Sequence, residues 1–465
     1  MAVLLLVAFV PAPTSPDAST LPPNVLIVLT DDQSYDTLPS LVGPPAMPWL
    51  QSQISMPGGH WVTFTNAFLN TPLCCPSRAS ILTGLTSAHT GVTSNFDGAD
   101  LDESSTLATW LHDAGYTTGL VGKYLNDFPW DRGPYVPPGW DRFFAKLNEQ
   151  LGTTYYGYGL LDQGVPLNVG DAPGDYATTF LAEQATAFLR SAPADHPWFL
   201  LFAPPAPHQP WTPAPGDVGA FSGSPVPRPS DRVLNDVRGK PAWVRALPPV
   251  SAERARDLEE RRRRERETLL AVDRAMRAFV SEVAARGELD RTVIVFMTDN
   301  GLSFGEHRWT SKRCPYEPCV RTPLVIRTPW VPGGTVDDLV SNIDLAPTIV
   351  DLARTAAAAP APAMDGVSLR GFLDARDGSP RPIREGVLLQ YAGDAQVPAW
   401  RAVRTADDVY IENADGTVEL YDLSGRIGAP DPNELRNRAR DPRYRAVETR
   451  LRSLLASLVR AEGGG

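Results

Sequence analysis

Four short apolar runs along the chain contain no polar alternation, and they occupy residues 25–29, 117–121, 198–202 and 292–297. Continuous apolar runs of this length are typical of strands that are buried on both faces of a parallel sheet. Before the last run, apolar residues recur at spacings of three and four, namely Leu269, Val272, Met276, Phe279 and Val283. This spacing predicts the buried face of an amphipathic helix. Strands that alternate with helices in this way predict an α/β layered fold.

The pattern changes near residue 354 and becomes that of a second, smaller unit. The alanine- and proline-rich segment 356–363 predicts a linker, so units at 24–355 and 384–465 are expected to be joined by residues 356–383. In the second unit, short apolar segments predict strands at 386–391, 402–404, 409–412 and 418–421. Asp415-Gly416 predicts a hairpin turn, and residues 444–459 predict a helix. We therefore expect a small antiparallel sheet with one helix.

Composition and charge indicate a globular chain and exclude one class of function. Hydrophobic residues make up 43% and charged residues 21% of the 465 positions, as expected for a protein with a sizeable core. The net charge of −11 excludes a generally basic nucleic-acid-binding protein, but it allows an anionic substrate that is held by a few local cations. The run 259–267 (EERRRRERE) is interpreted as a solvated helix surface whose charges pair with one another.

The first ten residues (MAVLLLVAFV) form an apolar stretch that is too short to cross a membrane, which requires about 20 residues. With the small and proline-rich segment that follows, they resemble the apolar core and tail of a secretory signal without its basic start. We therefore expect a truncated leader over residues 1–23 and a secreted, periplasmic or extracellular protein with no integral membrane segment. A cytoplasmic location is the alternative.

The chain contains four cysteines, which are too few for a disulfide scaffold, and their spacing does not resemble a structural zinc module. They are Cys74, Cys75, Cys314 and Cys319. In an exported protein the last two could close a small disulfide loop, and two free thiols are an equal alternative.

Polar residues follow two of the predicted strands directly. Asp31 and Asp32 follow the first run, and Asp299 and Asn300 follow the fourth. Ligands of open α/β sheets bind at the carboxyl ends of the strands, and oxygen donors suit a hard cation such as Ca²⁺ or Mg²⁺. Each pair alone could equally be a turn or a helix cap. The two pairs together favour a metal site with these four residues as ligands.

The segment 72–84 (PLCCPSRASILTG) carries the strongest signal in the chain. It resembles the signature of the formylglycine-dependent sulfatases in the alkaline phosphatase superfamily, which is Cys-x-Pro-Ser/Ala-Arg followed by two residues, two apolar residues, a small residue and Gly. The resemblance implies that Cys74, and not Cys75, is oxidised to formylglycine (3-oxoalanine) by a formylglycine-generating enzyme and joins the metal ligands. A buried pair of small apolar residues at a helix start is the competing interpretation.

The chemistry of this modification suits sulfate transfer. One hydroxyl of the hydrated aldehyde can take the sulfuryl group, and the other can then expel sulfate by collapse to the aldehyde. Arg78 lies four residues after Cys74, so on a helix both would lie on the same face, where Arg78 can steady the diol and the metal carboxylates. As the precursor of a nucleophile, the Cys74 side chain is expected to be exposed.

Further motifs extend the resemblance and imply three roles. Gly122-Lys123 implies that Lys123 is a sulfate-binding cation, and Pro207-His208-Gln209-Pro210 implies that His208 donates a proton to the leaving alcohol. Ser311-Lys312 implies that Lys312 is the second sulfate-binding lysine. The family also has segments similar to residues 341–348, 419–423 and 431–435, so the resemblance extends from residue 24 to about residue 459. It implies a large mixed, mainly parallel sheet flanked by helices, as in alkaline phosphatase.

The chain departs from the family at one position. Many sulfatases have a histidine two residues after the Gly-Lys lysine, proposed as the base for sulfate elimination, and Leu125 stands there in this chain. The sequence Lys123-Tyr124-Leu125-Asn126 resembles N-acetylglucosamine-6-sulfatases and some arylsulfatases instead. Asn126 could bind the sulfate group but cannot accept a proton near neutral pH. His307 is a candidate base, with a turn or surface role equally expected, while ordinary structural or exposed positions are expected for His60, His89, His112 and His196.

These patterns together predict a metal-dependent sulfuric ester hydrolase that acts on sulfated sugars or aryl sulfates. The resemblance favours Ca²⁺ over Mg²⁺. A phosphomonoester, phosphodiester or phosphonate hydrolase of the same superfamily is the first alternative, because Lys123, Lys312 and Arg78 do not discriminate against phosphate by charge alone. The second alternative is a non-catalytic carbohydrate-binding protein in which Cys74 is not converted.

Overall fold

The computed structural model describes residues 21–40, 42–147, 154–353, 363–374 and 383–462. Most of the expected leader and most of the expected linker segment lie outside these residues. None of the helices in the described ranges is long and apolar enough to span a membrane.

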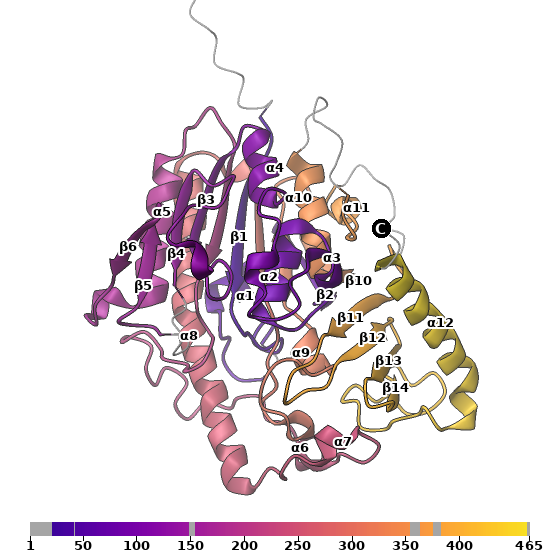
Figure 1. Cartoon of the computed structure of the whole chain (residues 1–465). Helices are drawn as coiled ribbons and strands as arrows, with labels where there is room; N and C mark the ends of the chain where they lie inside the picture. The colour runs from indigo at the N-terminus through magenta and orange to yellow at the C-terminus, as the bar shows by residue number, and fades with distance from the viewer. Residues whose placement is uncertain (1–20, 41, 148–153, 354–362, 375–382, 463–465) are drawn as a thin grey trace, which may run out of the picture.

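A ten-stranded mixed sheet forms the centre of the larger part of the molecule (Figure 1). Its strands, in spatial order, are β10 (Gly334–Ser341), β2 (Trp61–Phe68), β9 (Leu324–Arg327), β8 (Thr292–Thr298), β1 (Asn24–Thr30), β7 (Trp198–Ala203), β3 (Thr117–Gly122), β4 (Arg142–Lys146), β5 (Gly159–Asp162) and β6 (Val165–Asn168). The strands from β8 to β4 run parallel, whereas β9, β5 and β6 pair antiparallel with their neighbours. The four predicted strands are thus confirmed as the adjacent central strands β8, β1, β7 and β3.

Helices cover both faces of this sheet. The described helices are α1 (Pro48–Ile54), α2 (Cys74–Thr83), α3 (Ser87–Thr90), α4 (Leu107–Asp113), α5 (Ala177–Ser191), α6 (Asp231–Asn235), α7 (Ala242–Arg245), α8 (Ala252–Ala285), α9 (Glu317–Val320), α10 (Leu345–Ala353), α11 (Arg370–Leu373) and α12 (Arg445–Glu462). Alternate residues of β1 enter two cores, because Val25 and Ile27 pack with α2, α4 and α10, whereas Leu26 and Val28 pack with α1, α5 and α8. Each face of the central strands is therefore buried, as their unbroken apolar runs predicted.

The long helix α8 confirms one prediction and corrects another. All five apolar residues of its predicted buried face are fully buried in the core. The run 259–267 is only partly solvated. Arg263 pairs with Glu259 and Glu260 as expected, but Arg262, Glu265, Arg266 and Glu267 are buried. The reason is that α8 passes beside the chain that follows β1, where Glu265 accepts a hydrogen bond from the Ser34 backbone at 2.7 Å.

The smaller unit is an antiparallel sheet with a terminal helix, as predicted. Its strands are β11 (Val387–Tyr391), β12 (Trp400–Arg404), β13 (Asp408–Asn413) and β14 (Val418–Asp422), and Asp415-Gly416 forms the turn between the last two. One face packs on α12, and the other shares a core with residues of the larger part, including Phe68 and Tyr316. This shared core places the small sheet next to the chain that follows β8 and next to the end of β2 (Figure 1).

Candidate active site

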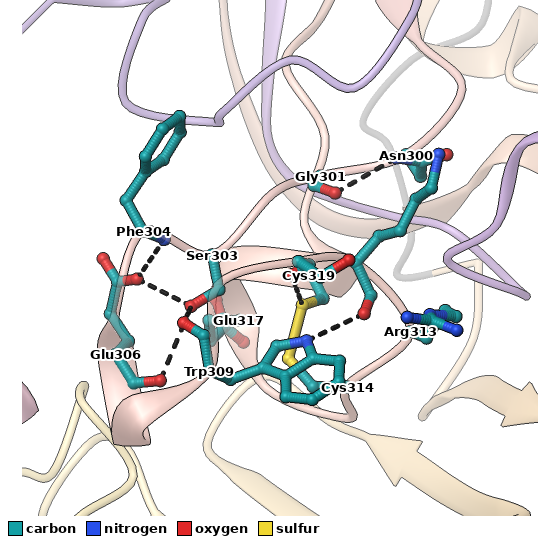
Figure 2. The surroundings of a disulfide bond; sticks show 12 residues. Asn300, Gly301, Ser303, Phe304, Glu306, Trp309, Arg313, Cys314, Glu317 and Cys319 are labelled. Carbon is teal, nitrogen blue, oxygen red and sulfur yellow. Dashed lines mark hydrogen bonds between the residues drawn. A yellow bond between two sulfur atoms is a disulfide. The ribbon is translucent and has the colours of Figure 1, made fainter. Parts of the chain in front are cut away.

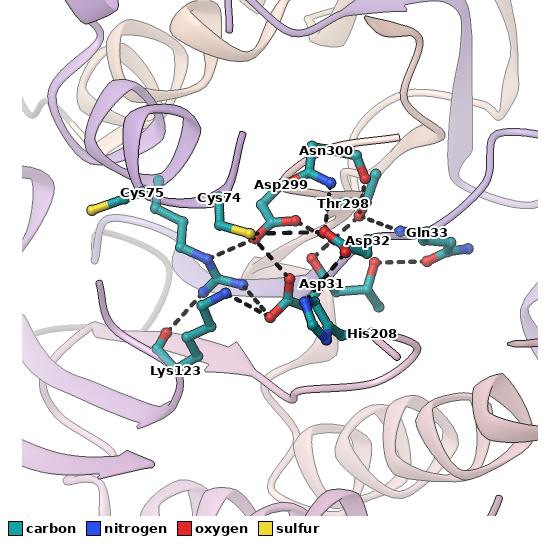
Figure 3. A network of polar contacts seen from close by, with 12 residues as sticks. Asp31, Asp32, Gln33, Cys74, Cys75, Lys123, His208, Thr298, Asp299 and Asn300 are labelled. Atoms are coloured by element: carbon teal, nitrogen blue, oxygen red, sulfur yellow. Dashed lines mark hydrogen bonds and ion pairs between the residues drawn. The ribbon is translucent and has the colours of Figure 1, made fainter. Parts of the chain in front are cut away.

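Three carboxylates and one thiol converge at the carboxyl ends of β1 and β8. These strands pair in parallel with Thr30 opposite Thr298, so the residues that follow them emerge at the same edge of the sheet. Asp31, Asp32 and Asp299, together with Cys74, each present one ligand atom within 4.8 Å of the others (Figure 3). The structure brings the two predicted polar pairs, Asp31-Asp32 and Asp299-Asn300, together at this edge.

The donor set fits a hard divalent cation. The three carboxylates and the Asn300 side chain are buried. Asn300 Oδ1 has no hydrogen-bond partner among the described residues, although Asn300 Nδ2 donates to Asp32 Oδ1 at 2.6 Å. Asp32 has a left-handed backbone (φ +58°), which is uncommon for a non-glycine residue and is held by a 3.2 Å hydrogen bond from its N–H to Asp299 Oδ1. Burial and the neighbouring Asp31 carboxylate raise the pKa of Asp299, because both disfavour the ionised carboxylate. A bound cation would stabilise the ionised form.

Cys74 is the first residue of α2, and its position corrects the expectation of an exposed side chain. Its exposed fraction is 1%, because Lys312 Nζ lies 2.8 Å from Sγ and the Asp31 and Asp32 carboxylates lie 3.6 and 3.7 Å away. Burial raises the Cys74 pKa to about 12, although Lys123 and Lys312 act in the opposite direction. The thiol is therefore protonated near neutral pH. The Cys75 side chain points away from the carboxylates (Figure 3).

The end of α2 explains the last position of the signature. The helix stops at Gly84, whose φ of +71° is the left-handed conformation of a helix C-cap. A Cβ at this position would lie 2.8 Å from Met364 Sδ and 3.0 Å from Pro347, so glycine also allows the close approach of the chain that follows α10.

Three cations surround the carboxylates. Lys123 Nζ lies 2.7 Å from Asp31 Oδ2, and Lys312 Nζ lies 2.7 Å from Asp32 Oδ1. Arg78 Nε donates to Asp299 Oδ2 at 2.7 Å. Burial disfavours ionisation of Asp31, but the nearby cations, led by Lys123, outweigh it and lower its pKa. Because three cations already match three carboxylates, a divalent metal would make the site net positive and suited to an anionic group.

The strand end at Gly122 positions Lys123. Gly122 has φ +120°, and a Cβ there would come within 2.0 Å of the Ala203 carbonyl oxygen on the adjacent strand β7. The Lys123 N–H donates to that carbonyl at 2.8 Å, and Arg78 donates to the Lys123 carbonyl at 2.9 Å. The Arg78 guanidinium is thus held at the Lys123 backbone, which is itself fixed to β7.

His208 lies at the side of the site where Asp32 is found. Its Nε2 lies 3.3 Å from Asp32 Oδ2, while Nδ1 lies 2.6 Å from the Gln209 carbonyl oxygen. A carbonyl only accepts hydrogen bonds, so Nδ1 carries a hydrogen and Nε2 faces the site. With 15% of its side chain exposed, His208 can hold or release a proton at Nε2 beside the carboxylates.

Asn126 and His307 are not joined to this cluster by any hydrogen bond or ion pair among the described residues. Asn126 Oδ1 is buried and has no hydrogen-bond partner in the part of the chain that the structure describes, and the Asn126 backbone carbonyl accepts the Trp130 indole N–H at 2.9 Å. His307 occupies a turn, η6 (Glu306–Arg308), which is one of the roles expected for it, and it is buried there, with an exposed fraction of 1% and its ring packed on Tyr316. Burial, and then Lys240, lowers the His307 pKa well below its ordinary value.

Some supporting contacts of the site could not be determined from the sequence. Cys314 and Cys319 form a disulfide bond directly after Lys312 (Figure 2), which decides between the two alternatives left open for this pair. Trp309 donates its indole N–H to the Lys312 carbonyl at 2.8 Å. Asn95 accepts the Cys75 backbone N–H at 3.0 Å at the start of α2. The Asn95 contact joins residues 20 positions apart, whereas the other two contacts are local, and sequence spacing alone does not determine whether such side chains meet.

Comparisons with known proteins agree with the geometry of the site. Residues 23–355 match the family model for sulfatases, and residues 305–461 match the model for the C-terminal region of N-sulphoglucosamine sulphohydrolase. An arylsulfatase of Volvox carteri is 31% identical over 95% of this chain and 75% of its own length. The human N-acetylglucosamine-6-sulfatase is 34% identical over 82% of this chain and 69% of its own length.

Solved structures share the fold over nearly the whole chain. One, determined in complex with its substrate D-glucosamine-2-N,6-O-disulfate, has a TM-score of 0.81 and 25% identity, and the match covers 96% of this chain and 99% of that chain. A phosphonate monoester hydrolase of Agrobacterium radiobacter shares the fold with a TM-score of 0.72 and 22% identity, over 95% and 96% of the two chains. On the family match and the relatives above 30% identity, this chain belongs to the sulfatase family and is a sulfuric ester hydrolase.

Proposed function

We propose that the enzyme hydrolyses sulfate esters of sugars at a metal site, with formylglycine formed from Cys74 as the nucleophile. The observation that carries this proposal is the position of Cys74 Sγ, which is 2.8 Å from Lys312 Nζ and within 3.7 Å of two carboxylates. Formylglycine supplies, in its hydrated form, the hydroxyl group that attacks sulfur.

Asp31, Asp32, Asp299 and Asn300 would hold the metal ion, together with position 74. When bound, a divalent cation supplies positive charge beside the oxygen atoms of the sulfate group. All four side chains are buried, and Mg²⁺ usually keeps several of its water molecules, whereas Ca²⁺ accepts many protein oxygens in flexible geometry. This difference favours Ca²⁺ over Mg²⁺.

Lys123, Lys312 and Arg78 would bind and orient the sulfate group and the nucleophile. Lys123 contacts Asp31, whereas Lys312 contacts Asp32. Their ammonium groups can therefore contact different oxygens of one sulfate group. The N-terminus of α2 at Cys74 adds a favourable dipole for an anion at the same point. Asn126 is proposed as a weaker contributor to substrate binding.

The substrate is proposed to be a sulfated amino sugar. The human relative is named for N-acetylglucosamine-6-sulfatase activity, and the similar solved structure holds D-glucosamine-2-N,6-O-disulfate. The Volvox carteri relative is named an arylsulfatase, which makes aryl sulfates convenient assay substrates.

His208→Ala is expected to slow hydrolysis of sugar sulfates about 10²–10⁴-fold and of nitrophenyl sulfate far less. A sugar hydroxyl has a much higher pKa than nitrophenol, so it needs a proton as the S–O bond breaks, and His208 Nε2 is placed to give it. Measuring kcat/KM of the variant on both substrates tests this role.

Asn126→Ala provides the comparison, because a residue that only orients the sulfate group should affect both substrates by similar factors. Equal losses on both substrates for His208→Ala would assign His208 to sulfate binding and leave the proton donor unidentified.

Phosphate ester or phosphonate hydrolysis is the second candidate activity, because the phosphonate monoester hydrolase of Agrobacterium radiobacter has the same fold. We expect higher kcat/KM for nitrophenyl sulfate than for nitrophenyl phosphate or a phenylphosphonate ester, measured in parallel on one metal-loaded preparation. A higher value for either phosphorus ester would reverse the assignment of the main substrate class.

We also propose that the protein is exported and that a formylglycine-generating enzyme matures it. A relative in Drosophila melanogaster, 32% identical over 77% of this chain and 32% of its own length, is named an extracellular sulfatase. Disulfides persist mainly in oxidising compartments, and the Cys314–Cys319 bond supports such a location.

A further inference from the structure

We propose that the Cys314–Cys319 disulfide, with Trp309, positions Lys312 for sulfate binding. The inference rests on the proposed role of Lys312 and adds what holds that lysine in place. Cys314 follows Lys312 by two residues, so the disulfide ring begins almost at the lysine itself.

The disulfide closes a short ring whose end contacts the metal-binding loop. Its cysteines are five positions apart and both are buried, with Cα atoms 5.8 Å apart. The carbonyl of Cys319 accepts the Gly301 N–H at 3.1 Å, and Gly301 follows the proposed metal ligand Asn300 directly (Figure 2). The ring therefore links the backbone after Lys312 to the backbone after a metal ligand.

Two tryptophans hold the backbone carbonyl groups of the two residues that precede Cys314. Trp309 donates its indole N–H to the Lys312 carbonyl at 2.8 Å, and Trp400 of β12 donates to the Arg313 carbonyl at 2.9 Å. The Arg313 N–H donates to the Pro72 carbonyl at 3.2 Å, two residues before Cys74. The lysine backbone is thus tied to the segment that carries the proposed nucleophile.

The middle of the ring is anchored on the small sheet. Tyr316 donates its hydroxyl to Glu419 Oε2 of β14 at 3.1 Å, and Lys240 Nζ lies 3.6 Å from the centre of the Tyr316 ring. Opening the disulfide would remove the covalent link between the two ends of this segment and leave their positions to hydrogen bonds and packing alone.

The ammonium group of Lys312 requires such support because it serves two partners. Its Nζ lies 2.7 Å from Asp32 Oδ1 and 2.8 Å from Cys74 Sγ, although lysine has a long and flexible side chain. A displacement of about 1 Å at a reacting group can cost about 10²-fold in rate. Cys314, Cys319 and Trp309 are therefore positioning residues, which influence substrate binding only through Lys312.

The test combines Cys314→Ala and Cys319→Ala in the matured, metal-loaded enzyme. We expect KM for nitrophenyl sulfate and Ki for inorganic sulfate each to rise about tenfold, within the range that misplacement of a binding group produces. Loss of the disulfide should also lower the melting temperature, but KM and Ki do not depend on the fraction of folded protein. A lower melting temperature with unchanged KM and Ki would overturn the proposal.

A double-mutant cycle with Lys312→Gln identifies the route of the effect. If the disulfide acts through Lys312, its removal from the Lys312→Gln enzyme should change KM by less than about twofold. Full additivity of the two losses would contradict the positioning role. An unchanged KM for Lys312→Gln alone would instead refute the proposed function of Lys312, so the two failures are distinguishable.

Trp309→Phe keeps the aromatic ring, removes the indole donor and serves as the second variant should the cysteine variant fail to fold. We expect KM and Ki to rise about three- to tenfold, because the loss of one hydrogen bond typically changes an equilibrium constant by about this factor. Val283→Ala, in the α8 core, is the matched control for lost stability and should leave KM unchanged. A KM equal to that of the wild type in Trp309→Phe would overturn the proposal.

Discussion

Replacing Cys74 with alanine is expected to abolish sulfate ester hydrolysis, with a loss of the order of 10⁵-fold or more, as for removal of other catalytic nucleophiles. Position 74 is where the three carboxylates and the Lys312 ammonium group converge, and alanine offers no group that can be converted to an aldehyde. The substitution removes one sulfur atom from a polar site, so the fold should be retained. Initial rates on nitrophenyl sulfate, with a thermal melt of the same sample, measure both expectations.

Cys75→Ala is the matched control. Cys75 is also buried, but its side chain points away from the carboxylates, and the signature allows any residue at this position (Figure 3). Its replacement should leave hydrolysis within about threefold of the wild type, as for a substitution that touches no reacting group. Cys74→Ser should fail unless the maturation system accepts serine. Turnover by Cys74→Ala at the wild-type rate would end the formylglycine hypothesis.

The second large effect is expected for Asp299→Ala, which should lose bound metal and at least about 10²–10³-fold in kcat. Asp299 accepts hydrogen bonds from Arg78 at 2.7 Å and from the Asp32 backbone at 3.2 Å. Its removal takes away a metal ligand and leaves the Arg78 guanidinium partly unpaired in a buried site. Metal content per protein, measured by inductively coupled plasma mass spectrometry, and kcat on one sample test both parts.

Asp290→Ala is the control for this variant, because Asp290 is exposed in η5 (Leu289–Arg291), just before the opposite end of β8. It should change neither metal content nor rate. If Asp299→Ala retained full metal occupancy and a normal rate, Asp299 would be only a turn residue.

The centre of the fold could be predicted from the sequence because its pattern is local. Strands buried on both faces leave unbroken apolar runs, and these located β1, β3, β7 and β8 and hence the edge where Asp31 and Asp299 meet. The outer strands carry no such run. β6 (VPLN) is only four residues long and contains a proline, and polar residues interrupt β10 (GTVDDLVS), so neither has the unbroken apolar run from which a buried strand is inferred.

The rest of the site depends on contacts between distant segments. Cys74 is buried because Lys312, more than two hundred residues later, lies over it, and Arg262 is buried because α8 passes close to Asp36 and Glu306. From the sequence, a disulfide bond and two free thiols were equally expected for Cys314 and Cys319, since spacing alone does not determine whether two cysteines meet in suitable geometry. Motifs therefore identified the residues of the cluster, whereas the structure was required for their surroundings.

The most direct test of the account is the mass of the peptide that contains Cys74, from protein produced together with a formylglycine-generating enzyme. Conversion of the thiol side chain to an aldehyde should make this peptide about 18 Da lighter than the sequence mass, with Cys75 unmodified. Active enzyme in which position 74 has the full mass of cysteine would contradict the account.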